Sequence, residues 1–100
     1  MKLVQLFIPL YDNDGEPFND DHFVKLKDEL NLNFGGVTIY RPATGFWNRS
    51  ERPAQKDEIL IYEVMVKHIE STYWKGLKER LMAQLRQETM VFRYSDIELL

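Results

Sequence analysis

Two apolar runs, residues 2–11 and 58–68, constrain the fold of this chain more than any other feature of its sequence. Both are rich in branched and aromatic side chains, which favours strands buried in a sheet. Neither approaches the roughly 18 to 20 apolar residues that a membrane-spanning helix needs. The first run is short for a secretory leader, and no small-residue cleavage site follows it. We therefore expect two central strands, no membrane segment and a cytoplasmic location.

Two other segments carry apolar residues at spacings of three and four, the period of a helix with one buried stripe. The first stripe predicts a helix over about 20–31, with Asn19 or Asp20 as its N-cap. The second predicts a helix over about 72–88, with Ser71 or Thr72 as its cap. The stripes consist of Phe23, Leu26 and Leu30, and of Trp74, Leu77, Leu81 and Leu85.

Two shorter strands complete the pattern, at residues 37–40 and 89–94. Pro42 should limit the first of them, and residues 42–57 read as a long polar connection. The resulting order, β-α-β-β-α-β, is typical of the ferredoxin-like α+β fold. We expect one domain over residues 1–100, with a four-stranded antiparallel sheet and both helices on one face. Right-handed crossovers place the first and third strands at the centre of the sheet.

The other face of this sheet should be open, and strand alternation predicts which side chains lie on it. Gln5, Tyr40 and Glu63 fall on the open face among apolar neighbours, namely Leu3, Phe7, Tyr11, Ile61 and Met65. So much apolar surface is unusual for a monomer. It favours a homodimer formed through the sheet face, cover of that face by a chain terminus, or a pocket for a small-molecule ligand between the sheet and its partner. We therefore expect a non-catalytic interaction or small-ligand-binding module. The candidate ligand-binding residues are Gln5, Tyr40, Trp47 and Glu63.

Two other functions stay open on the sequence. In a small dimeric α+β-barrel enzyme of the oxygenase or isomerase type, Glu63 would be the residue that moves a proton. In a nucleic-acid-binding protein, the segment 41–56 would provide four basic residues and two aromatic rings. The net charge of −3 and a third strand without paired aromatics make nucleic acid the less favoured partner.

No residue pattern predicts a metal or a cofactor. The chain has no cysteine, which excludes disulfides and thiolate ligands. The acidic segment from Asp12 to Asp21 lacks a carboxylate at the first ligand position of a calcium loop, because aligning Gly15 with the glycine of that loop puts Leu10 there. An Asp-Gly turn before a helix explains the segment better.

One stretch of the chain resembles a family of uncharacterised small bacterial domains with the pattern F-x-G-x-T…G-x-W…E. The matching residues are Phe34, Gly36, Thr38, Gly45, Trp47 and Glu58, and Gln87-Glu88 stand before the last strand as in that family. The resemblance implies the fold and no activity. It also implies that Trp47 lies on a bent hairpin arm and packs its indole against the body of the domain.

Overall fold

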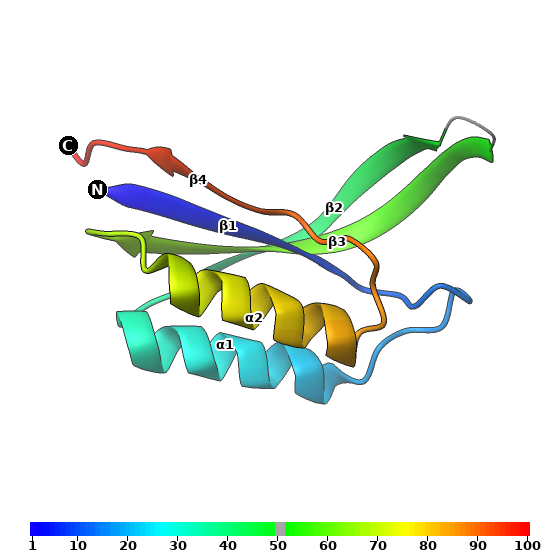
Figure 1. Ribbon diagram of the computed structural model, residues 1–100, viewed down its shortest axis with the longest axis horizontal. Coiled ribbons are helices and arrows are strands. Elements are labelled where there is room, and N and C mark those ends of the chain that lie inside the picture. The colour runs from blue at the N-terminus through cyan, green and yellow to red at the C-terminus, as the bar shows by residue number, and fades with distance from the viewer. Residues whose placement is uncertain (50–51) are drawn as a thin grey trace.

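The computed structural model describes residues 1–49 and 52–100, but leaves out the side chains of residues 42, 43, 47–49 and 52–57. Two helices and four strands follow one another in the predicted order (Figure 1). Their bounds are β1 Lys2–Pro9, α1 Asp20–Phe34, β2 Thr38–Arg49, β3 Arg52–Val66, α2 Ser71–Gln84 and β4 Phe92–Asp96.

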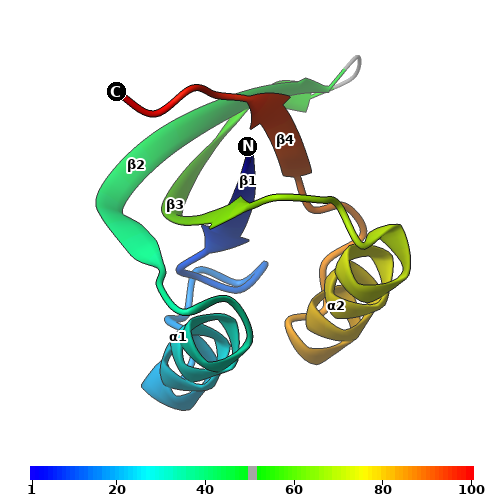
Figure 2. The same ribbon diagram turned by 90° about the vertical axis from the view of Figure 1, so that its left-hand side faces the viewer.

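The four strands form one antiparallel sheet in the order β2-β3-β1-β4, which confirms the ferredoxin-like α+β fold. As expected, β1 and β3 are the central strands, and Leu6 lies opposite Tyr62 in their register. Both helices lie side by side on one face of the sheet (Figure 2). The four strands therefore have one covered face and one open face.

The core lies between the helices and the covered face of the sheet. The predicted stripes of both helices are buried in it, together with alternate residues of the central strands, namely Val4, Leu6, Ile8, Leu60, Tyr62, Val64 and Val66. Tyr62 is fully buried, and its hydroxyl donates to the carbonyl oxygen of Phe23 at 3.2 Å. Burial raises the pKa of Tyr62 to about 12, so this hydroxyl stays a donor that ties β3 to α1.

The prediction of a polar connection over 42–57 is wrong, because β2 and β3 continue through it. Beyond the pairing of Ile59 with Pro9, these two strands extend as a hairpin, here named the arm, which consists of 44–49 and 52–57. The arm points away from both helices (Figure 1). Pro42 is tolerated because β2 is an edge strand and its register shifts between Tyr40 and Ala43.

The ends of α1 follow the sequence signals closely. Asn19 is the N-cap, as predicted, and its side chain accepts a hydrogen bond from the backbone N–H of Asp21 at 2.9 Å. The helix runs three residues beyond the predicted end at 31 and finishes at Phe34. Gly35, with φ of 75°, adopts the left-handed conformation that ends it, which a glycine does at no steric cost.

The ends of α2 differ from the prediction. Its N-cap is Glu70, which makes no capping hydrogen bond, so neither Ser71 nor Thr72 is the cap. The helix ends at Gln84 instead of about residue 88, because Arg86 is left-handed with φ of 52°. The N–H of Gln87 then bonds the carbonyl of Met82 at 2.9 Å, which is a Schellman ending with arginine where glycine is usual. The last strand is consequently shifted to Phe92–Asp96.

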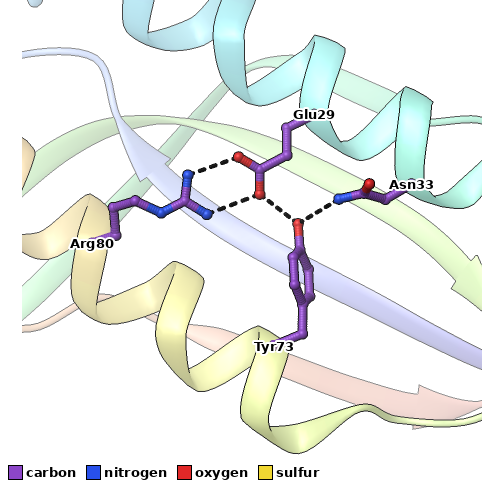
Figure 3. A network of polar contacts seen from close by, with 4 residues as sticks. All are labelled: Glu29, Asn33, Tyr73 and Arg80. Carbon is purple, nitrogen blue, oxygen red and sulfur yellow. Dashed lines mark hydrogen bonds and ion pairs between the residues drawn. The ribbon is translucent and has the colours of Figure 1, made fainter.

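A polar network joins the two helices (Figure 3). Arg80 donates two hydrogen bonds to the carboxylate of Glu29, at 2.8 and 2.9 Å, and the hydroxyl of Tyr73 donates a third at 2.6 Å. Asn33 in turn donates to the Tyr73 hydroxyl at 3.3 Å. The bonds from Arg80, and then from Tyr73, outweigh partial burial and hold the pKa of Glu29 below its ordinary value of 4.5.

We predict that Glu29→Gln lowers the free energy of unfolding at about pH 7 by about 0.5–1 kcal/mol, since Arg80 is half exposed and such pairs are weak. A lowered carboxyl pKa stabilises the fold above the unfolded value and loses that effect as pH falls through the folded value. The gap between the two proteins should therefore close below about pH 4. Urea unfolding measured across this range, with the exposed Asp28→Asn as control, tests the prediction. An equal, equally pH-dependent loss in Asp28→Asn contradicts it.

Candidate functional site

The open face of the sheet is largely apolar, as the alternation predicted. Its apolar members are half-buried or exposed, with Tyr40 at 50% and Met65 at 53% exposure. Helix packing leaves them uncovered, because both helices are on the other face (Figure 2). The set consists of Leu3, Phe7, Tyr40, Ile61 and Met65, with Tyr11 just beyond the end of β1.

Four polar side chains cross this face from one edge of the sheet to the other. Arg93 Nε donates to Gln5 Oε1 at 2.8 Å, and Gln5 Nε2 donates to Glu63 Oε1 at 2.6 Å. The Tyr40 hydroxyl donates to the second oxygen of Glu63 at 3.1 Å. We name Tyr40, Glu63, Gln5 and Arg93 the open-face network. Three of the four predicted ligand-binding residues are thus brought into contact.

Strand register produces the open-face network. Gln5 lies directly opposite Glu63 on β3 and opposite Arg93 on β4, so the three side chains form one row across the sheet. Directly opposed residues have Cβ atoms about 5 Å apart, which is within reach of side-chain hydrogen bonds. Tyr40 reaches the row diagonally, since its own partner on β3 is Ile61. The network therefore depends on the pairing of strands that are distant in sequence.

Sequence reasoning did not single out Arg93. Its guanidinium lies over the ring of Phe7, 4.7 Å from the centroid, in addition to its bond to Gln5. The sequence signal was present, because Phe92 is apolar and Arg93 is the next residue in a predicted strand. Alternation would have placed Arg93 on the face opposite Phe92, but nothing in the sequence paired it with Gln5.

The hydrogen bonds of the open-face network fix its chemistry. The amide of Gln5 must turn its oxygen to the cationic Arg93 and its nitrogen to the carboxylate of Glu63, so only one orientation satisfies both neighbours. Glu63 raises the pKa of Tyr40, first by accepting its hydrogen bond and then by its charge, so Tyr40 remains a protonated donor. The row thus presents a carboxylate and a guanidinium on a largely apolar face.

Trp47, the fourth predicted ligand-binding residue, lies on the arm. Its backbone pairs with Gln55, seven residues along β2 from Tyr40. Its side chain is outside the described residues, and so the prediction that its indole packs against the domain stays a prediction. The same holds for the nucleic-acid hypothesis, because the side chains of Arg49, Arg52 and Lys56 are also outside them. Phe46, which is described, is 68% exposed.

The acidic segment after β1 forms a turn. Asp12 Oδ1 accepts hydrogen bonds from the backbone N–H groups of Asp14 and Glu16, both at 2.9 Å, and Gly15 has φ of 82°. Across the described part of the chain, no group of three or more histidine, aspartate or glutamate side chains is placed to hold a metal ion. Within the same residues, no helix is long and apolar enough to cross a membrane.

No protein-family model matches the sequence, and no curated protein matches it. The resemblance to the small bacterial domains therefore stays a prediction. Solved structures do match the fold. A phage SAM lyase in complex with S-methyl-5′-thioadenosine is 12% identical, with a TM-score of 0.65 over 95% of this chain and 80% of that one.

Two further matches are CutA proteins. The PII-like protein CutA from Nostoc sp. PCC 7120 is 13% identical, with a TM-score of 0.59 over 98% of this chain and 82% of that one. CutA1 from Pyrococcus horikoshii is 14% identical, with a TM-score of 0.58 over 100% of this chain and 86% of that one. At these identities the likeness shows the fold alone.

We predict that Glu63→Gln lowers the pKa of Tyr40, because the substitution removes the negative charge that opposes ionisation of the phenol. NMR titration of the Tyr40 ring measures this pKa, and Tyr40→Phe assigns the resonance. Asp96→Asn, which removes a carboxylate at the far end of β4, is the control and should leave Tyr40 unchanged. A Tyr40 titration that is identical in wild type and Glu63→Gln would show that the two side chains do not interact in solution.

Proposed function

We propose that this chain is a small-ligand-binding module that works as a homodimer through its open sheet face, with the ligand held between the two faces. The observation that carries the proposal is the open-face network, an ordered set of hydrogen-bonding groups on a face that is otherwise apolar. Ligand pockets commonly combine an apolar lining with a few fixed polar groups. An open apolar face of this kind is also typical of an interaction surface.

The size of the open face fits a dimer. At about 3.3 Å per residue and 4.8 Å between strands, the eight residues of β1 and four strands span roughly 26 by 19 Å. Two such faces would together bury about 1,000 Å², which is near the lower bound for a stable protein interface. A dimer of this size would be modest in strength, so a ligand between the faces would add to its stability.

The charges of the open face favour a second copy of this chain as its partner. Glu63 and Arg93 flank Gln5 on opposite sides in the same row. A twofold axis that passes over Gln5 parallel to the strands would therefore place Glu63 of each copy opposite Arg93 of the other. A twofold interface requires this kind of self-complementarity. It would also align the apolar residues on both sides of the row.

The open-face network fits a ligand with a flat apolar part and hydroxyl groups. The carboxylate of Glu63 accepts hydrogen bonds from hydroxyls, while Phe7 and Arg93 provide an aromatic and a planar cationic surface for stacking. A nucleoside has both features. The similarity of this fold to a phage SAM lyase bound to S-methyl-5′-thioadenosine supports this ligand class and supplies the probe for its test.

We predict that Glu63→Arg and Arg93→Glu are each monomeric, because like charges would then face one another in the dimer. Mixing the two variants should restore a dimer, since each cation would again oppose a carboxylate. Sedimentation velocity or light scattering measures both results. A wild-type protein that is monomeric at all concentrations would overturn the dimer, and single variants that remain dimeric would overturn this interface.

We predict that S-methyl-5′-thioadenosine raises the melting temperature of the wild-type protein and has a much smaller effect on Glu63→Gln. Calorimetric titration should show at least a tenfold weaker affinity for Glu63→Gln, about 1.4 kcal/mol. Glu79→Gln on the exposed side of α2 is the matched control. No binding, or equal binding to all three proteins, would rule out this ligand site. Chemical conversion of the probe would instead favour the alternative in which Glu63 transfers a proton.

A further inference from the structure

A second candidate site lies at the helix-covered side of the sheet edge, where α2 passes β4. It is a cleft of about 250 Å³, open to solvent, between the first two turns of α2 and the strands β1 and β4. Its walls are mostly apolar and include Val4, Trp74, Phe92 and Tyr94. The cleft opens on the covered side of the sheet, where Val4 and Trp74 belong to the core, and it shares only Arg93 with the open-face network.

The rim of this cleft is basic. Lys75 and Lys78 stand one turn apart on α2 and border it, with Lys78 half-buried. Neither lysine forms an ion pair with an acidic residue among the described side chains, and no acidic residue is among those that line the cleft. Arg93 also borders the cleft, but its Nε is bound to Gln5 on the open face. The two lysines are therefore the cations at the rim that make no hydrogen bond to another side chain among the described residues.

The backbone of α2 adds to the positive potential of the cleft. Ser71, the first residue of the helix, lines it, and the helix has neither a capping side chain nor an acidic residue in its first turn. The N–H groups of the first turn therefore donate to no capping side chain, although the carboxylate of the N-cap residue Glu70 is exposed at the same end of the helix. An anion bound near Ser71 and Lys75 would accept hydrogen bonds from these N–H groups.

Trp74, one of the residues that line the cleft, carries a buried polar atom without a partner. Trp74 is 6% exposed, and its ring stacks on Phe34 with centroids 5.0 Å apart. Its indole Nε1–H is buried and has no acceptor among the described residues. Buried donors are normally satisfied, and an unsatisfied one costs about 1–3 kcal/mol.

From these observations we infer that the α2–β4 cleft binds a small organic anion with an aromatic body and one carboxylate. The aromatic body lies against Trp74 and Tyr94, of which Tyr94 is 58% exposed when the cleft is empty. The carboxylate lies at the rim, near Lys75, Lys78 and the first turn of α2. The small volume excludes large cofactors, because pockets for drug-sized ligands begin at about 300 Å³.

Phenylacetate is the probe, and the neutral phenylacetamide is its matched control ligand. We expect phenylacetate to shift the NMR signals of Ser71, Tyr94 and the indole N–H of Trp74. The variant Trp47→Phe leaves a single indole N–H and so assigns that signal. Phenylacetamide should bind more weakly, since it lacks the charge that the lysines and the helix terminus attract.

The variant Lys75→Gln/Lys78→Gln should weaken phenylacetate binding by about tenfold and leave the affinity for phenylacetamide unchanged. The control Lys25→Gln/Lys27→Gln removes the same charge from α1 and should change the phenylacetate affinity by less than about twofold. If both double variants lose the same affinity for phenylacetate, net charge alone explains the loss and the proposed site is wrong. Shifts confined to the open face, or no shifts at millimolar phenylacetate, would overturn it as well. The result is independent of whether the open face binds a ligand or a second copy.

Discussion

The rest of the structure depends on the antiparallel pairing of β1 with β3 at the centre of the sheet. This pairing sets Leu6 against Tyr62 on the covered face and Gln5 against Glu63 on the open face. A slip of one residue would exchange the faces of one strand, because side chains alternate with a period of two. It would expose the core residues of that strand and separate the two halves of the open-face network. Because such a slip would expose apolar side chains, burial of the core holds the open-face network in register, although the network itself contributes little to the core.

The two candidate sites use opposite sides of the same sheet and different kinds of polar group. The open-face network consists of side chains that satisfy one another, so a ligand there would exchange existing hydrogen bonds for new ones. The α2–β4 cleft has lysines without acidic partners, an uncapped helix terminus and an unsatisfied indole. An anion would pair with the two lysines without displacing an acidic partner from them. The open-face network would therefore select a ligand by the positions of its hydrogen-bonding groups. The α2–β4 cleft would select a ligand by its negative charge.

Much of the fold was predictable because burial leaves a periodic trace in the sequence. The stripe of Phe23, Leu26 and Leu30 and the alternation of Leu60, Tyr62 and Val64 each identified an element and its buried side. Polar segments carry no such trace, which explains why the sequence predicts a connection where the structure has the arm. Its strands are held by backbone hydrogen bonds between β2 and β3, and these depend little on side-chain type. The sequence does not predict the end of α2 at Gln84, because arginine is an unusual residue at a left-handed helix end and gives no stop signal.

The open-face network was likewise predictable only in part. Alternation within single strands placed Gln5, Tyr40 and Glu63 on the open face, and the structure brings the three into contact. Arg93 joined them only through the pairing of β4 with β1, which brings together residues 88 positions apart in the chain. The α2–β4 cleft likewise arises from the packing of a helix beside an edge strand.

By itself, the sequence determined the order of helices and strands, the covered face and the place of Gln5, Tyr40 and Glu63 on the open one, because these follow from local periodicity. Only the tertiary structure decided which polar groups meet and where a cleft remains. Both are set by strand register and helix placement, which come from contacts between distant parts of the chain.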